Sequence, residues 1–166
     1  MRYLKENTQT ALAQLATYLT MHNLTISCAE SCTGGGLAYA FTSLPGSSIW
    51  FKHSVVTYSN EAKQIMVGVT DTTLKQYGAV SEQTVAEMAH GVVHQVGANI
   101  GISISGIAGP DGGSAEKPVG TVWFGFVLNG ISHTRKMYFV GDREAVRLQA
   151  IEYAIEQIVE LLPIRN

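Results

Sequence analysis

The chain has 166 residues, of which 46% are hydrophobic and only 14% are charged. This length is typical of one domain, and the apolar share is large enough for a hydrophobic core, which excludes a disordered chain. Eleven basic and thirteen acidic residues give a net charge of -2 without a basic block, which argues against an electrostatic nucleic-acid binder. We therefore expect a single domain over residues 1–166 that binds a small molecule.

The sequence has no long apolar run and no cysteine-rich motif. The longest apolar runs, such as Val122 to Leu128, are far shorter than the roughly 20 residues that span a bilayer. The first ten residues also lack the apolar region of a signal peptide, so we expect a cytoplasmic protein without membrane contact. Cys28 and Cys32 are the only cysteines, and their spacing fits neither a disulfide scaffold nor a zinc ribbon. We expect two reduced thiols.

Helices and short strands alternate along the first two thirds of the chain, as judged from the spacing of apolar residues and from runs of β-branched and aromatic residues. In chain order, the sequence predicts a helix ending before His22, a strand over 24–28, a helix over 37–41, a strand over 49–58, a helix capped by Asn60 and ending at Val67, a short helix over 72–77, a long helix capped by Ser81, strands over 100–105, 119–128 and 131–140, and a last helix from about Asp142. The Asn129-Gly130 pair predicts a type I′ hairpin turn. This order favours an α/β fold in which helices cover both faces of a mixed sheet.

The segment AESCTGGG, residues 29–36, places Ser31 and Cys32 between the end of a strand and a glycine-rich helix start. A nucleophile elbow has this arrangement, because the strand end exposes a side chain while free N–H groups of the next helix stabilise an oxyanion. The G-x-S-x-G pattern is absent. Two alternatives stay open: a capped helix start in which Ser31 or Thr33 bonds to the backbone, and a phosphate cradle, which lacks the usual Lys-Ser or Lys-Thr after the glycines.

The histidines offer neither a base nor a metal site. His90 and His94 have the i, i+4 spacing of metal ligands, but they fall opposite the apolar stripe of their helix and lack the glutamate of H-E-x-x-H. We therefore expect both to be exposed.

Lys63 is a better candidate for the general base than the histidines. In the first turn of a helix capped by Asn60, the helix dipole disfavours a cation by about 0.3–1 kcal/mol, which would lower the pKa of Lys63. A lysine that acts as a general base needs such a shift, and burial would increase it. Tyr58, at the end of the preceding strand, could relay a proton or hold the lysine. The alternative is a surface lysine beside a packed tyrosine.

Five motifs, in the order AESCTGG, VVTYSNEAK, GAVS, SGIAGPDGG and KPVGTV, resemble the CinA C-terminal domain family. The resemblance runs from about Leu24 to the final helix. It implies a three-layer α/β/α sandwich and an amidohydrolase that deamidates nicotinamide mononucleotide to nicotinate mononucleotide and ammonia. It implies no cofactor and no metal, and it implies a homodimer.

The resemblance places the nucleophile at Ser31 and its tyrosine and lysine partners at Tyr58 and Lys63. We expect Ser31 to attack the carboxamide carbon while neutral Lys63, helped by Tyr58, takes the hydroxyl proton. Oxyanion contacts are expected from the backbone N–H groups of the first glycine-rich segment, and contacts to the ribose-phosphate from the loop Gly106 to Gly113 and from a basic pair in the last helix. The residues concerned are Thr33, Gly34, Gly35, Ser105, Gly106, Gly109, Arg143 and Arg147.

The chain departs from the family pattern at two places. His53-Ser54 replaces a glycine pair before the V-x-Y-S-N strand, which bears on the strand geometry and the pocket wall. Ser105 replaces a threonine and keeps the hydroxyl. The alternative function is a non-catalytic nucleotide-binding or assembly module of the same fold, and ammonia release from nicotinamide mononucleotide distinguishes the two.

Overall fold

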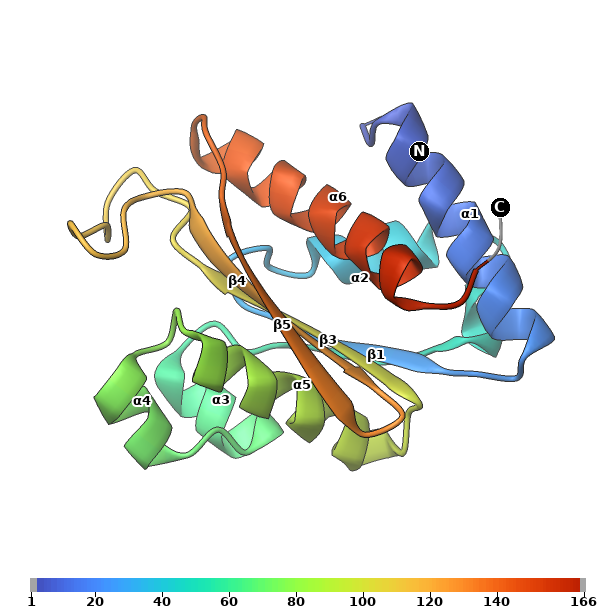
Figure 1. Ribbon diagram of the computed structural model, residues 1–166, viewed down its shortest axis with the longest axis horizontal. Helices are drawn as coiled ribbons and strands as arrows, with labels where there is room; N and C mark the ends of the chain where they lie inside the picture. Colours follow the sequence, from blue (N-terminus) through green and yellow to red (C-terminus); the bar gives the residue numbers. More distant parts are fainter. Residues whose placement is uncertain (1–2, 165–166) are drawn as a thin grey trace.

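The computed structural model describes residues 3–164, in which five strands form one mixed sheet in the order β2-β1-β3-β4-β5 (Figure 1). The strands are β1 (Ile26–Glu30), β2 (Phe51–Val56), β3 (Ile100–Gly106), β4 (Thr121–Leu128) and β5 (Ile131–Tyr138). β1 is parallel to both β2 and β3, whereas β4 is antiparallel to both β3 and β5. The predicted mixed sheet is confirmed.

Helices cover both faces of this sheet (Figure 1). One face carries α1 (Glu6–Met21), α2 (Gly36–Thr42) and α6 (Arg143–Leu161), and the other carries α3 (Asn60–Val67), α4 (Asp71–Tyr77) and α5 (Glu82–Val96). The three-layer α/β/α sandwich is therefore confirmed. Among the helices of residues 3–164, none combines the length and the apolar character needed to cross a bilayer.

Each face of the sheet has its own hydrophobic core. The core under α1, α2 and α6 contains Cys28 and Phe41, and the core under α3, α4 and α5 contains Ala29 and Met88. Successive side chains of a strand point to opposite faces, so β1 sends Cys28 to one core and Ala29 to the other. The same alternation directs the next residue, Glu30, toward α2, where its carboxylate accepts hydrogen bonds.

The helices agree with the sequence prediction to within a residue or two, and four of the five strands differ from it by two residues at an end. β4 begins at Thr121 and β5 ends at Tyr138, each two residues inside the predicted strand. β1 begins at Ile26 and continues to Glu30, so Ser31 follows the strand directly. The predicted strand over 49–58 is shorter, because a 3-10 turn occupies Ser47–Ile49 and β2 ends at Val56. The hairpin turn is confirmed, since Asn129 and Gly130 have φ of 50° and 81°, the positive values that a type I′ turn requires.

The helix that carries Lys63 packs against α5 through a glycine. A Cβ added at Gly91 would overlap the carbonyl oxygen of Val67, the last residue of α3. Alanine gains about 1 kcal/mol over glycine in a helix, but forced overpacking costs about 1–3 kcal/mol, and here the obstacle is backbone. We expect Gly91→Ala to lower the free energy of unfolding in urea by about 1 kcal/mol or more.

The matched control is His90→Ala, because His90 is exposed on the same helix. It should change the free energy of unfolding by no more than about 0.5 kcal/mol. A Gly91→Ala protein as stable as the parent would contradict the close approach of α3 and α5.

Candidate active site

The ends of β1 and β2 bring the predicted nucleophile and base together. Parallel neighbours end at the same edge of a sheet, so Ser31, directly after β1, lies near Thr57, directly after β2. The Ser31 N–H donates to the carbonyl oxygen of Ile104 in β3 at 2.9 Å. The serine is therefore still attached to the sheet, although it already begins the turn toward α2.

Lys63 reaches this edge from α3. Its Nζ lies 3.1 Å from Ser31 Oγ and 2.8 Å from the carbonyl oxygen of Thr57. Lys63 is 1% exposed and Ser31 is 7% exposed. Burial lowers the pKa of Lys63 from the ordinary lysine value, and the neighbouring Cys32 opposes this shift to a smaller extent. The result is a buried pair of hydroxyl and amine in which the amine is biased toward its neutral form.

The predicted cap of α3 is wrong by one residue. Ser59, not Asn60, has the extended backbone of an N-cap, and its hydroxyl accepts the Ala62 N–H at 3.0 Å. Both residue types cap helices well, so the sequence did not decide between them. The Lys63 N–H already donates to the Ser59 carbonyl at 3.1 Å, which places Lys63 past the unpaired amides of the helix start. Burial rather than the helix dipole therefore lowers the pKa of Lys63.

The Ser31–Lys63 pair opens into a pocket of about 260 Å³. Ser105 lies beside the pair at the floor, 1% exposed, with its hydroxyl donating to the Ala79 carbonyl at 2.7 Å. The exposed lining residues form the mouth: Tyr58, Asn60 and Arg143. The sequence does not identify Asn60 as a pocket residue, because the N-cap of the helix is predicted there. Since Ser59 is the N-cap, the Asn60 side chain is available to line the mouth of the pocket.

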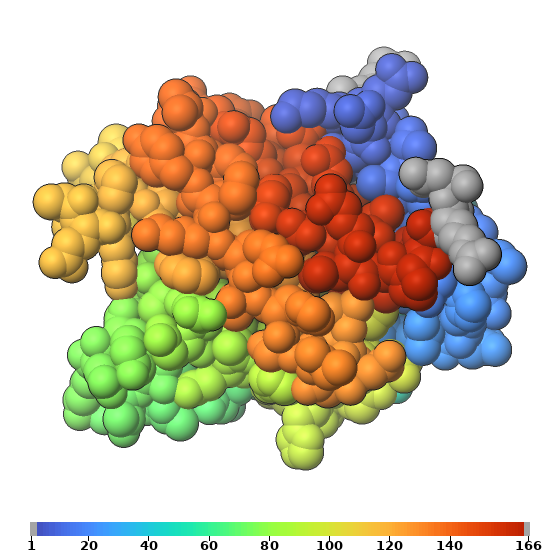
Figure 2. Space-filling model, in the orientation of Figure 1, coloured from blue at the N-terminus to red at the C-terminus, as the bar shows by residue number. Residues whose placement is uncertain are grey.

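Arg143 joins two sides of the mouth. Its Nη2 donates to the Tyr58 hydroxyl at 3.2 Å, and its Nη1 donates to the carbonyl oxygen of Gly109 at 2.8 Å. Gly109 belongs to the loop between β3 and β4, which projects from one end of the molecule (Figure 2). In the described chain the Tyr58 hydroxyl is thus bonded to Arg143 rather than to Lys63, and Tyr58 is 62% exposed.

In the glycine-rich turn after Ser31, Cys32 lines the pocket, whereas the side chain of Thr33 and the two glycines that follow it are not among the lining residues. Gly34 and Gly35 have φ of 60° and 92°, which glycine adopts without strain. The Gly34 N–H, one of three expected oxyanion donors, instead donates to the Ser31 carbonyl at 3.1 Å. Thr33 is fully buried. Arg147, expected at the phosphate beside Arg143, instead donates to backbone carbonyls of this turn.

A comparison with known sequences identifies the family. The sequence profile of the CinA C-terminal domain matches residues 8–162. The chain belongs to the CinA C-terminal domain family. The resemblance based on the five motifs is confirmed.

Two relatives share much of this CinA domain. A protein of Enterobacter agglomerans named nicotinamide-nucleotide amidohydrolase PncC is 61% identical over 132 residues, which cover 79% of this chain and 80% of the relative. A protein of the same name from Escherichia coli (strain K12) is 53% identical over 146 residues, covering 87% and 88%.

The fold agrees with solved structures of the family. The crystal structure of the competence/damage inducible protein CihA from Agrobacterium tumefaciens matches with a TM-score of 0.91 and 41% identity. The match covers 95% of this chain and 97% of that protein.

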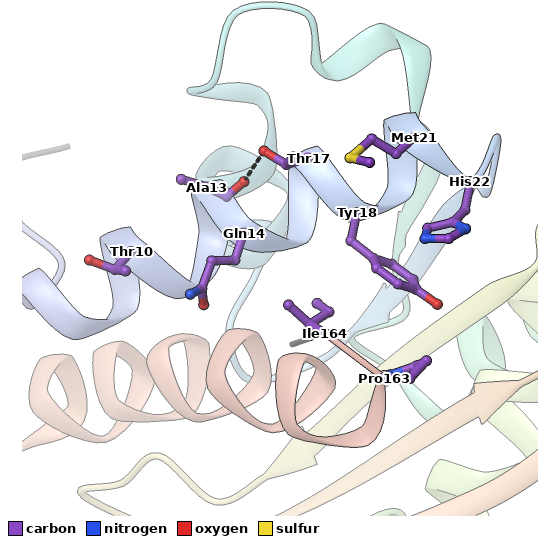
Figure 3. A pocket seen from close by; sticks show the side chains of 9 residues that line it. All are labelled: Thr10, Ala13, Gln14, Thr17, Tyr18, Met21, His22, Pro163 and Ile164. Carbon is purple, nitrogen blue, oxygen red and sulfur yellow. Dashed lines mark hydrogen bonds between the residues drawn. The ribbon is translucent and has the colours of Figure 1, made fainter. Parts of the chain in front are cut away.

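This CinA domain also has a larger hollow, of about 540 Å³, between α1 and the residues that follow α6 (Figure 3). Tyr18, Met21, His22 and Ile164 are among its lining residues. Its described lining residues include no serine, lysine or carboxylate, whereas the smaller pocket brings Ser31 and Lys63 together.

The histidines of α5 are exposed, as predicted from their position opposite the apolar stripe. Within residues 3–164, no group of three or more His, Cys, Asp or Glu side chains could hold a metal ion.

Proposed function

We propose that residues 1–166 form a single-domain nicotinamide-nucleotide amidohydrolase that converts nicotinamide mononucleotide to nicotinate mononucleotide and ammonia. The names of relatives at 61% and 53% identity support this substrate. The observation that carries the mechanism is the buried contact of 3.1 Å between Ser31 Oγ and Lys63 Nζ. A serine hydroxyl becomes an effective nucleophile only beside a base, and Lys63 is the base in contact.

In the first step, Ser31 Oγ attacks the carboxamide carbon while neutral Lys63 takes its proton. The hydrogen bond from Lys63 to the Thr57 carbonyl occupies one N–H, and the lone pair of the neutral amine remains available to accept the proton of Ser31, 3.1 Å away. The resulting Lys63 ammonium then protonates the departing nitrogen, and ammonia leaves. Water then attacks the carbonyl carbon of the acyl ester while neutral Lys63 takes a proton from the water. The Lys63 ammonium returns this proton to Ser31 Oγ, and the acid is released.

The burial gradient of the pocket orients the substrate. Ser31, Lys63 and Ser105 lie at the floor, so the carboxamide enters first. The mouth then receives the ribose-phosphate, where exposed Arg143 supplies the positive charge for the phosphate. Tyr58 holds Arg143 by its hydroxyl.

Backbone atoms complete this arrangement. Gly109 holds the Arg143 guanidinium through its carbonyl oxygen, and Gly106 forms part of the pocket wall. For the oxyanion we propose the Thr33 amide, because it follows the pocket-lining Cys32 directly, whereas the Gly34 amide already has a partner and Gly35 lies further along the turn. The proposed steps use only these side chains and backbone groups, so the proposal includes no metal and no cofactor.

Purified protein should release ammonia from nicotinamide mononucleotide in equal amount to nicotinate mononucleotide. The measurement is an ammonia assay combined with chromatography of the product. Protein that binds the nucleotide but releases no ammonia would instead be the non-catalytic nucleotide-binding or assembly module. The proposal includes a cytoplasmic homodimer, which light scattering during gel filtration would test.

A further inference from the structure

The turn that carries Ser31 is held from two directions by buried or half-buried ionisable side chains. On one side, Glu30 is fully buried, and its carboxylate accepts the Leu37 N–H at 2.8 Å and the Ala38 N–H at 3.0 Å. These are amides of the first turn of α2, which has no side-chain cap from Gly35. Glu30 therefore caps α2 from the end of β1 and fixes the far end of the turn.

On the other side, Arg147 reaches the turn from α6. Its Nε donates to the Cys32 carbonyl at 3.1 Å and its Nη2 donates to the Thr33 carbonyl at 3.2 Å. Position 34 favours glycine because of its φ of 60°, and the guanidinium packs directly against it, since a Cβ there would meet Nη2 at 3.4 Å. A planar guanidinium can hold two successive carbonyls at once, which a lysine ammonium cannot do with fixed geometry.

This contact also sets the direction of an amide. In a trans peptide the C=O and the N–H point in opposite directions. Because Arg147 draws the Cys32 carbonyl toward α6, the N–H of Thr33 in the same peptide must point away from α6. The Gly34 amide is already used by the Ser31 carbonyl, which leaves the Thr33 amide as the donor of this turn that Arg147 orients.

We propose that Arg147 is a positioning residue for the oxyanion-binding turn, not a ligand of the substrate phosphate. Glu30 anchors the other end of the same turn. This inference rests on the proposed function, since it assigns a role within that reaction. It replaces the expectation that Arg143 and Arg147 act together. Arg143 lines the pocket mouth, whereas Arg147, one helical turn later, does not line the pocket and donates to the backbone carbonyls of Cys32 and Thr33.

The two roles predict different kinetic changes. A positioning residue alters the transition state, so Arg147→Lys should lower kcat by about tenfold or more, toward the roughly 100-fold loss seen when an oxyanion donor is removed. KM, and inhibition by nicotinate mononucleotide and by inorganic phosphate, should change by less than about threefold. Arg143→Lys is the matched control and should mainly raise KM and weaken inhibition by phosphate.

Circular dichroism and the binding of nicotinate mononucleotide, measured by calorimetry, establish that each variant is folded. If Arg147→Lys instead raises KM and weakens phosphate inhibition as Arg143→Lys does, Arg147 is a phosphate ligand and the proposal is overturned. An unchanged kcat also overturns it.

A second readout does not depend on the natural substrate. The rate at which a fluorophosphonate modifies Ser31 also depends on a donor for the phosphoryl oxygen, so Arg147→Lys should slow this modification by about tenfold. A parent protein that releases no ammonia would contradict the proposed function, while slower modification in the variant would still support the positioning role. Equal modification rates in parent and variant would overturn the positioning role.

Discussion

Ser31→Ala is expected to lower the turnover of nicotinamide mononucleotide by roughly 10⁴-fold or more, as loss of a nucleophile does. Ser31 is the hydroxyl in contact with Lys63, at 3.1 Å, and alanine removes the atom that forms the acyl ester. Binding of the product nicotinate mononucleotide should persist, because the mouth of the pocket keeps Arg143 and Tyr58.

Cys32 is the competing nucleophile, because it follows Ser31 directly and also lines the pocket. Burial raises the pKa of the Cys32 thiol to about 11, so the thiol is protonated at neutral pH, whereas the nucleophile is the thiolate. The side chain is 6% exposed and belongs to the larger hydrophobic core. Cys32→Ala should therefore cost about 1 kcal/mol of stability and keep most of the turnover.

The decisive measurement is the turnover of both alanine variants beside the parent treated with iodoacetamide. If Ser31→Ala is active while Cys32→Ala and the alkylated parent are inactive, Cys32 is the nucleophile and the serine mechanism is wrong.

Lys63→Arg is expected to reduce turnover nearly as severely as the loss of Ser31, although it keeps the positive charge. A guanidinium stays protonated throughout the accessible pH range, so it cannot accept the serine proton. Lys63→Met, which has similar length without a base, should be equally inactive. Near-parental turnover by Lys63→Arg would mean that the site needs only a cation at this position.

The pH dependence tests the same group. Burial lowers the pKa of Lys63, so kcat/KM of the parent should rise with pH through this lowered pKa and then level off as the amine becomes neutral. The free energy of unfolding should also rise with pH. Between the lowered pKa of the folded state and the ordinary pKa of the unfolded chain, the unfolded state binds one more proton, so the free energy of unfolding rises with pH.

Lys63→Met is the reference for this stability measurement. In acid the folded parent must bury a cation, so its free energy of unfolding should be lowest relative to that of Lys63→Met. As the pH rises, the free energy of unfolding of the parent should increase relative to that of the variant. A difference that stays flat across the alkaline range would mean that burial does not perturb Lys63.

Local patterns in the sequence predict much of this fold. Ser81 caps α5 because a hydroxyl residue precedes a long apolar stripe, and Asn129-Gly130 forms the hairpin because both residues tolerate positive φ. The pairing of Ser31 with Lys63, 32 residues apart, is not a local pattern. It depends on β1 and β2 being parallel neighbours, and only the family resemblance linked the two residues in advance.

Two sequence predictions, the N-cap of α3 and the pairing of Arg147 with Arg143, differ from the structure because tertiary contacts decide them. Ser59 and Asn60 are equally good caps by type, and the backbone geometry selects Ser59. Arg143 and Arg147 look equivalent on one face of a helix, yet Arg147 contacts carbonyls 115 and 114 residues earlier in the chain. The partners of a long side chain depend on which loop the fold places beside it, and spacing within its own helix does not carry that information.

The hairpin at Asn129 and Gly130 offers a place to attach a label or an inserted peptide. Both residues are exposed, and the turn lies at the end of β4 opposite the loop that reaches Arg143 (Figure 1). Because an antiparallel strand rises about 3.4 Å per residue, the eight residues of β4 separate the turn from that loop by roughly 27 Å. A fluorophore or affinity tag at the hairpin could therefore report on or immobilise the enzyme while leaving the Ser31 pocket open to substrate.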